Sequence, residues 1–297
     1  MRLVSYLSGG SARVGCVKGD KVVDLSACDP QIPSTMRGLI EGGDAAMARV
    51  KDALADPSAS NSFDLGALTL LPVVTDAPKI LCVGLNYVDH AKEGGNAVPD
   101  YPGMFMRSNR SMIGHGEPMV RPHASDTLDY EAELLVIVGR GGRHISQADA
   151  LSHVFGYSIC NDGSVRAYQR KGAQWTPGKN FDGTGAVGPW IVTPDELPEG
   201  ADGLTIRSRL NGEVMQNSNT KNMIFKVPHV IAIASEFTTL EPGDMIAMGT
   251  PEGVGYPRNP PVFMRPGDVV EVEIEDIGVL RNPVIDESDA VPREARR

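Results

Sequence analysis

The stretch from residue 129 to residue 138, DYEAELLVIV, strongly constrains how this chain can fold. Its apolar residues continue on both faces of a predicted strand, which indicates that the strand is buried. Because side chains alternate along a strand, Glu131 and Glu133 project from the same face. Two carboxylates that enter a core together are costly unless a cation compensates them. The segment therefore predicts either a site for a hard divalent cation or a strand end where both acids are hydrated.

A third carboxylate, Asp162, follows another apolar strand predicted over residues 154–160. It lies where that strand should end and a helix begin, which is a common place for functional side chains. The alternative is helix capping, for which Asp is well suited. Three carboxylates leave two or three coordination positions for water or substrate, as Mg²⁺ or Mn²⁺ would require, and unlike the nitrogen and sulfur ligation of zinc.

Short strand-like runs dominate the chain from Lys79 onward. The 33 Gly and 22 Pro residues are spread along the chain, which indicates many turns between short strands. The dipeptide Asn211-Gly212 predicts a hairpin, and helices are expected over residues 164–171 and 227–237. The predicted strands are 80–83, 131–138, 154–160, 190–192, 204–210, 245–248 and 269–274. The simplest architecture is a strand-rich α+β fold with a closed or sandwiched sheet.

The N-terminal part is expected to form a small unit of its own. Strands are predicted over residues 2–6, 12–17 and 21–25, followed by a helical pattern that Ser34 or Thr35 could cap and that Gly42-Gly43 interrupts. Residues 72–78 resemble a linker. We therefore predict a small α+β domain over residues 1–74 and a larger strand-rich domain, which contains the three acids, over residues 75–297.

The composition excludes several classes of protein. The formal net charge is -10, and the only basic cluster is the terminal Arg293, Arg296 and Arg297, so a nucleic-acid partner is not expected. An anionic substrate must be captured by local groups or by a metal ion. No apolar stretch approaches the roughly 20 residues of a spanning helix, and the start of the chain lacks a signal-peptide core, so no membrane association and a cytoplasmic location are expected.

Familiar nucleotide-binding and serine-hydrolase motifs do not fit this chain. Residues 183–188 match the dinucleotide fingerprint by letters, but they run into a predicted strand where the fingerprint requires a helix. There is no G-x-S-x-G nucleophile elbow. Nucleotide binding and serine hydrolysis are therefore excluded.

Six motifs, in this order, resemble the fumarylacetoacetate hydrolase family over roughly residues 77–284. They are GLNYVDHAKE (84–93), DYEAEL (129–134), NDGSVRAYQ (161–169), GKNFD (178–182), GPW (188–190) and GTPEGVG (249–255). The resemblance implies a mixed β-sandwich roll, usually dimeric, that binds Mg²⁺ or Mn²⁺, with Ca²⁺ as an alternative, through Glu131, Glu133 and Asp162. The long founding enzyme of the family has a further aspartate ligand where this chain has Val83, so a three-ligand site is expected. Other departures from the small members, such as Gly163 and Asn180, leave the choice of substrate open.

The resemblance also implies roles for the other motif residues. His90 and Glu93 correspond to the pair that activates water, and their spacing would place both on one helical face. Taken alone, His90 would be a surface or capping residue. Lys179 would supply positive charge to an oxyanion or carboxylate, with a solvated surface lysine as the alternative. The substrate-contacting residues would be Arg166, Gln169, Tyr87, Gly249 and Thr250.

The resulting functional expectation is a homodimeric metal-dependent hydrolase. It would cleave a C–C bond in a dicarbonyl acid, such as fumarylpyruvate or maleylpyruvate, in the catabolism of aromatic compounds, through a metal-stabilised pyruvate enolate. The same enolate chemistry would serve an oxaloacetate decarboxylase, or an isomerase or hydratase of 2-oxo-enoic acids. A non-catalytic metal-binding protein is disfavoured, because metal binding alone would not require His90, Glu93 and Lys179.

Overall fold

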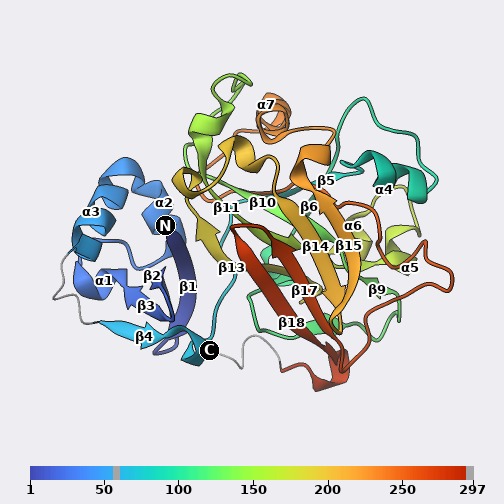
Figure 1. The fold of residues 1–297 in the computed structure, drawn as a ribbon, viewed down its shortest axis with the longest axis horizontal. Helices are drawn as coiled ribbons and strands as arrows, with labels where there is room; N and C mark the ends of the chain where they lie inside the picture. Colours follow the sequence, from blue (N-terminus) through green and yellow to red (C-terminus); the bar gives the residue numbers. More distant parts are fainter. Residues whose placement is uncertain (56–60, 292–297) are drawn as a thin grey trace.

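The computed structural model describes residues 1–55 and 61–291, whose strands form three sheets (Figure 1). The largest sheet has the order β4-β3-β2-β1-β13-β11-β10-β16-β5-β6, with β7 paired to β13. A second sheet, β15-β14-β17-β18-β8, packs against β10, β11 and β13, and β12 pairs with β9. Most pairings are antiparallel, whereas β13 with β7, β16 with β5 and β18 with β8 are parallel. The predicted strand-rich fold with mixed sheets is confirmed.

Most predicted strand runs lie within two residues of an observed strand, but the run predicted over residues 190–192 begins at residue 185. The strands over residues 62–64, 103–107, 112–113, 119–121, 128–129, 164–165 and 278–286 were not predicted. The described residues contain 18 strands. They are β1 (Arg2–Ser8), β2 (Ser11–Lys18), β3 (Lys21–Asp24), β4 (Ser62–Asp64), β5 (Ile80–Gly84), β6 (Gly103–Arg107), β7 (Met112–Ile113), β8 (Met119–Arg121), β9 (Leu128–Asp129), β10 (Ala132–Val138), β11 (Val154–Asn161), β12 (Ser164–Val165), β13 (Gly185–Val192), β14 (Thr205–Leu210), β15 (Glu213–Asn219), β16 (Met245–Ala247), β17 (Val269–Ile274) and β18 (Gly278–Asp286).

The helices lie around the outside of the sheets (Figure 1). They are α1 (Leu25–Cys28), α2 (Met36–Glu41), α3 (Gly43–Ala55), α4 (Val88–Glu93), α5 (Arg166–Gln169), α6 (Thr176–Lys179) and α7 (Val227–Phe237). Of these, α2, α3 and α7 contribute buried residues to the cores. The helix predicted over residues 227–237 is confirmed. In the ranges 1–55 and 61–291, no helix is both long and apolar enough to cross a membrane.

The helix predicted over residues 164–171 is wrong in extent. Ser164 and Val165 form strand β12, which pairs with Asp129 and Leu128 of β9, and only residues 166–169 are helical. The tertiary pairing with β9 overrides the local helical pattern.

Strand β10 is buried on both faces because it lies between two cores. Leu134, Val136 and Val138 belong to the core shared with the five-stranded sheet, whereas Leu135 and Ile137 belong to the core that also includes residues of α2 and α3. This two-sided burial accounts for the continuous apolar run in the sequence.

Two local predictions are confirmed in detail. Asn211 and Gly212 both have positive φ, 53° and 83°, as a two-residue turn between β14 and β15 requires. Thr35 caps α2, because its side chain accepts a hydrogen bond from the backbone N–H of Gly38.

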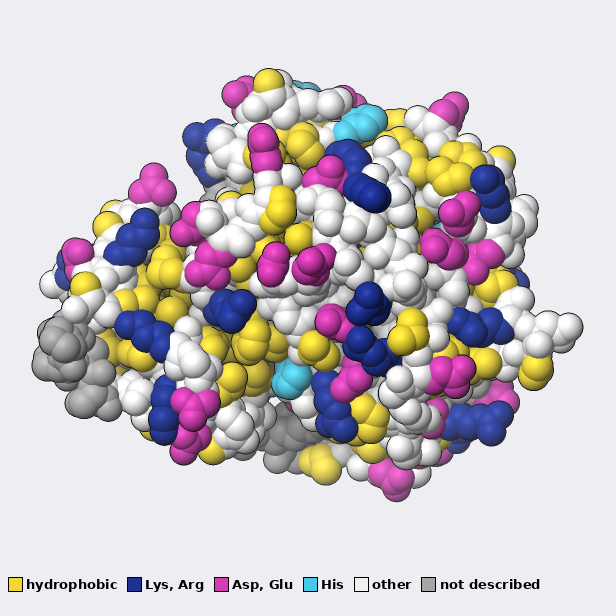
Figure 2. Space-filling view, viewed as in Figure 1, with side chains coloured by type: hydrophobic (Ala, Val, Ile, Leu, Met, Phe, Trp, Pro, Cys, Tyr) yellow, Lys and Arg dark blue, Asp and Glu magenta, His cyan; other side chains and the backbone are white. Residues whose placement is uncertain are grey.

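The N-terminal strands continue the large sheet into the rest of the molecule. Strand β1 pairs with β13, with Arg2 opposite Val192 and Leu3 opposite Ile191. The division into residues 1–74 and 75–297 stays a prediction. On the face shown in Figure 2, Lys and Arg side chains are interspersed with Asp and Glu side chains. The terminal arginines 293, 296 and 297 lie outside the described residues.

A buried charge network fixes the N-terminal strands to α1. The Asp24 carboxylate accepts hydrogen bonds from the Tyr6 hydroxyl at 2.6 Å, from Arg13 Nη2 at 2.8 Å and from the backbone N–H of Ala27 at 3.0 Å. Burial raises the pKa of Asp24, but the hydrogen bonds from Arg13 and Tyr6 outweigh it and hold this pKa below its ordinary value.

Replacing Asp24 with Asn is expected to lower the free energy of unfolding by about 2 kcal/mol at neutral pH. Because a lowered folded-state pKa stabilises the protein above the unfolded pKa, the difference from wild type should shrink as the pH falls below about 4. Denaturant unfolding at several pH values measures both effects. Asp64→Asn, which removes an exposed partner of Lys21, is the control and should change little at any pH. A pH-independent effect of Asp24→Asn would contradict this account.

Candidate metal centre and active site

A cavity of about 450 Å³ lies where β5, β10 and β11 meet the short helices α4, α5 and α6. Its wall includes three acids: Glu133 in β10, Glu131 just before β10, and Asp162 just after β11. His90 from α4 and Lys179 from α6 complete this part of the wall. The structure thus brings the predicted metal ligands and two of the predicted catalytic residues to one cavity.

The pairing of β10 with β11 brings the three acids together. Ala132 lies opposite Asn161, and just beyond this pair the backbone N–H of Asp162 donates to the carbonyl of Glu131 at 3.0 Å. One oxygen from each of Glu131, Glu133 and Asp162 lies within 4.8 Å of the others, and all three residues are buried. The capping alternative for Asp162 does not hold, because the N-cap position of α5 is Val165.

Two of the three acids are compensated by buried cations. Lys179 Nζ bridges Glu131 Oε2 at 2.6 Å and Asp162 Oδ2 at 2.5 Å. Arg166 Nη1 lies 2.7 Å from Glu131 Oε1, and Arg107 Nη1 lies 2.5 Å from Asp162 Oδ1. Burial raises the pKa of Glu131, but Lys179 and Arg166 outweigh it and the pKa lies below its usual range. Lys179 is 2% exposed, so the solvated-lysine alternative does not hold.

Glu133 is the acid that lacks a cation. In the part of the chain that the structure describes, no Lys or Arg lies within ion-pair distance of it, and its hydrogen-bond partner is the backbone N–H of Gly249 at 2.8 Å. Burial, together with the neighbouring Asp162 and Glu131, raises the pKa of Glu133 well above its ordinary value. A divalent cation would supply the missing charge, and an all-carboxylate set of ligands suits a hard ion. The residues present therefore fit a divalent metal.

His90 and Glu93 form the predicted pair on α4. His90 Nδ1 lies 2.8 Å from Glu93 Oε1, and Glu93 Oε2 accepts a hydrogen bond from the backbone N–H of Gly253 at 2.9 Å. His90 is 6% exposed and lines the cavity, so it is not a surface residue. If Nδ1 donates to Glu93, the neutral ring has Nε2 free to accept a proton.

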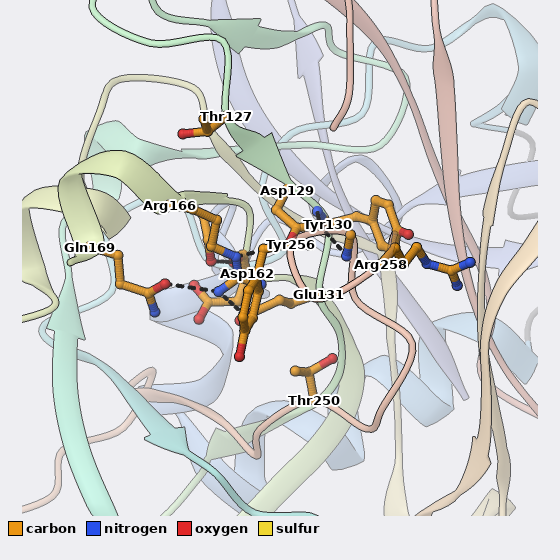
Figure 3. Close-up of polar contacts among 12 residues, drawn as sticks. Thr127, Asp129, Tyr130, Glu131, Asp162, Arg166, Gln169, Thr250, Tyr256 and Arg258 are labelled. Atoms are coloured by element: carbon orange, nitrogen blue, oxygen red, sulfur yellow. Dashed lines mark hydrogen bonds and ion pairs between the residues drawn. The ribbon is translucent and has the colours of Figure 1, made fainter. Parts of the chain in front are cut away.

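The predicted substrate-contacting residues fall into two groups. Arg166, Gln169 and Thr250 line the cavity, and Figure 3 shows their side chains around Glu131 and Asp162. Gly249 and Tyr87 are not among its lining residues. Gly249 has a φ of 86° and uses its N–H on Glu133, while Tyr87 is 1% exposed and packs in the core shared with the second sheet. Their contact with substrate stays a prediction, and the geometry assigns both a structural part.

Several residues around the site were not singled out from the sequence. Arg107 is the last residue of β6 and forms an ion pair with Asp162. Gln216 Nε2 donates to the Thr250 hydroxyl at 2.7 Å. Asp129 accepts from Arg166 Nε at 2.8 Å and from the N–H groups of Gly255 and Tyr256 (Figure 3). Asp129 lies in the acidic motif, which is the one signal that could have pointed to it.

A model described as fumarylacetoacetate (FAA) hydrolase C-terminal matches residues 79–285, which is more than half of the chain. The chain belongs to the fumarylacetoacetate hydrolase family. Among known family members, oxaloacetate tautomerase fahd2, mitochondrial, of Xenopus laevis is 42% identical over 291 residues, covering 96% of this chain and 90% of the frog protein. The predicted resemblance is confirmed.

Two solved structures show the same fold in the fumarylacetoacetate hydrolase family. Fumarylacetoacetate hydrolase from Exiguobacterium antarcticum is 36% identical with a TM-score of 0.83, covering 97% of this chain and 100% of that one. Maleylpyruvate hydrolase from Sphingobium sp. SYK-6, solved with manganese(II) ion and pyruvate, is 31% identical with a TM-score of 0.79, covering 96% and 99%. The manganese of this relative and the buried acid triad of our chain together indicate a divalent metal.

The predicted cytoplasmic location is wrong by this comparison. The frog relative and its human and bovine counterparts in the fumarylacetoacetate hydrolase family are named as mitochondrial. The prediction rested on the lack of a secretory core at the start of the chain, and that pattern distinguishes secreted proteins only.

Adding Mg²⁺ or Mn²⁺ to the metal-free protein is expected to raise its thermal unfolding midpoint, because the folded acid triad binds the ion and the unfolded chain does not. Glu133→Gln removes one ligand and should abolish most of this shift. Differential scanning fluorimetry with and without chelator measures it.

A second variant, Glu131→Gln, also removes a proposed ligand but in addition breaks ion pairs, so comparing the two variants separates loss of metal binding from loss of stability. With chelator present, Glu133→Gln should unfold no earlier than wild type, because the amide keeps the shape of a buried carboxyl that has no cationic partner and whose ionisation burial disfavours. Glu131→Gln should cost about 3 kcal/mol or more, because it deprives Lys179 and Arg166 of a partner. A full metal shift in Glu133→Gln would contradict the proposed ligand set.

Proposed function

We propose that this chain is a divalent-metal-dependent enzyme that interconverts the keto and enol forms of oxaloacetate or a closely related 2-oxo dicarboxylic acid. The observation that carries the proposal is the similarity to oxaloacetate tautomerases, which reaches 40 to 42% identity over 96% of the chain. It favours the alternative drawn from the sequence, an oxaloacetate decarboxylase or an isomerase or hydratase of 2-oxo-enoic acids, over acylpyruvate hydrolysis.

The oxygen-only ligand set supports Mg²⁺ or Mn²⁺ as the ion, with Ca²⁺ as an alternative. Glu131, Glu133 and Asp162 would hold it. When bound, such an ion polarises the 2-oxo acid and stabilises negative charge on its C2 oxygen.

The protein's own part is to move a proton. His90 Nε2 accepts the proton from C3 of the keto acid, the C3–H electron pair forms the C2=C3 bond, and the C2 oxygen takes the negative charge. Glu93 stabilises the imidazolium that forms, and the Gly253 N–H holds Glu93 in place. His90, or water, then returns the proton to the C2 oxygen to give the enol, and the reverse path gives the keto acid.

Lys179 and Arg166 support this chemistry by keeping Glu131 ionised. Both are bound to Glu131, and Lys179 also binds Asp162. Their charges outweigh the burial that would otherwise favour the protonated form of Glu131. We infer that they shape the ligand set, and that Thr250 and Gln169 contact the substrate.

Replacing His90 with Ala should lower kcat for oxaloacetate tautomerisation by about 100- to 10,000-fold, because the proton acceptor is lost. The metal-induced thermal shift should persist, because His90 is not among the three acids. Loss of the ultraviolet absorbance of the enol measures the rate. His123→Ala, which changes an exposed histidine outside the cavity, is the control and should have wild-type activity. Wild-type turnover by His90→Ala would rule out its catalytic role.

Hydrolysis of an acylpyruvate is the second candidate function. The cavity of about 450 Å³ falls in the range that accommodates ligands larger than a four-carbon acid. The relative from Sphingobium sp. SYK-6 is a maleylpyruvate hydrolase. Hydrolysis additionally requires a water molecule positioned for attack on the distal carbonyl, whereas keto–enol exchange does not.

A substrate panel separates these functions. We expect metal-dependent loss of enol oxaloacetate without release of pyruvate, and slower or no cleavage of maleylpyruvate and fumarylpyruvate. Absorbance, pyruvate assays and carbon dioxide release, each with Mg²⁺ or chelator, measure the three reactions. Faster metal-dependent cleavage of an acylpyruvate would make hydrolysis the function, and carbon dioxide release would make it a decarboxylase.

A further inference from the structure

The cationic side chains that line the cavity are of two kinds. Lys179 and Arg166 are both buried and are bound to carboxylates of the site. Arg170 also lines the cavity, but among the described residues no carboxylate lies within ion-pair distance of it. Its charge is therefore not neutralised by the protein.

Arg170 is nevertheless held in place. It follows α5, and its backbone N–H donates to the carbonyl of Arg166 at 3.3 Å. Its guanidinium lies 4.2 Å from the centre of the Tyr256 ring, and that of Arg166 lies 4.7 Å from the same ring. A cation held against an aromatic ring is oriented without losing its charge to an acid.

The position of Tyr256 is itself determined by two contacts. Its backbone N–H donates to Asp129 Oδ2 at 3.0 Å. A Cβ at Gly94 would lie 2.4 Å from the Tyr256 hydroxyl, so the ring tip occupies space that only glycine leaves open. The backbone of Tyr256 is thus held by Asp129, and its ring tip fits the space beside Gly94.

We propose that Arg170 binds the carboxylate of the substrate that is remote from the acid triad, and so selects 2-oxo dicarboxylates over 2-oxo monocarboxylates. This inference rests on the proposed function, because it assumes that the 2-oxo acid end lies at the triad. The other two cations of the described cavity wall, Arg166 and Lys179, are already paired with its acids, so Arg170 is the cation there that remains free to attract a second carboxylate. A guanidinium offers paired N–H donors that match a carboxylate.

Lys171 provides a matched control. It is the next residue, it is also a cation held against an aromatic ring, with Nζ 3.5 Å from the centre of Tyr168, and it is not among the residues that line the cavity. If any positive charge in this segment were enough to attract the substrate carboxylate, Arg170→Met and Lys171→Met would weaken binding equally.

The test combines turnover with binding of unreactive probes. Malate carries the remote carboxylate and lactate lacks it, and neither has a keto group to enolise. With Mg²⁺ present, calorimetry should show malate binding wild type more tightly than lactate. Arg170→Met should weaken malate binding, and raise KM for oxaloacetate, by about 10- to 100-fold with a much smaller change in kcat. Lactate binding should be unchanged.

The variants distinguish recognition from general damage. Arg170→Lys keeps the charge without the planar fork and should recover part of the malate affinity. Lys171→Met should match wild type in both assays, and thermal unfolding should be similar for all variants. Equal effects of Arg170→Met and Lys171→Met, or equal affinity of wild type for malate and lactate, would overturn the inference.

Failure of the proposed function gives a different pattern. If wild type shows no metal-dependent tautomerisation but Arg170→Met selectively loses malate affinity, the carboxylate site stands and serves another reaction of a dicarboxylic acid. If tautomerisation is normal in Arg170→Met and malate affinity is unchanged, the proposed function stands and Arg170 does not recognise substrate.

Discussion

The uncompensated charge of Glu133 is the constraint on which the rest of the site depends. Four buried carboxylates meet three buried cations, so the cluster lacks at least one positive charge. The acids are Asp129, Glu131, Glu133 and Asp162, and the cations are Arg107, Arg166 and Lys179. A divalent ion makes the cluster electrically favourable without any change in the protein. This deficit is the reason that we propose the triad as a metal centre and not as a network of ion pairs that only stabilises the fold.

The fold keeps this charged cluster rigid by burying β10 on both faces. One face packs on the five-stranded sheet and the other on the core that α2 and α3 share. A shift of β10 that moved Glu131 or Glu133 would disturb the packing in both hydrophobic cores. Close packing resists such displacement, so the acids stay together although each repels its neighbours. The N-terminal strands and helices therefore contribute to the site without reaching it.

The sequence predicted contacts correctly where the two residues are close together in the chain. Alternation along residues 129–138 predicted that Glu131 and Glu133 share a face, and the spacing of His90 and Glu93 predicted their contact. The sequence did not predict contacts between residues that are far apart in the chain. Arg107 is 55 residues from the Asp162 that it binds, and nothing in the apolar β6 segment marks that pairing. The extent of the helix after residue 164 was missed for the same reason, since strand β9 pairs with its first two residues.

The charged groups of the cavity that are paired with one another and those that remain free to contact a substrate have different parts in the proposed function. Glu131 and Asp162 are paired with buried cations, and in our proposal they contribute to a metal site that would act on any 2-oxo acid. On our proposals, two groups of the described cavity wall remain available to substrate: the Nε2 of His90, which would accept a proton, and the guanidinium of Arg170, which would bind a second carboxylate. Relatives with this fold are named as a tautomerase, a diene-dioate isomerase and a maleylpyruvate hydrolase. If these reactions share an enolate, as our proposal assumes, they must differ in how the rest of the substrate is held. We therefore propose that side chains at the cavity wall, such as Arg170, contribute to that difference.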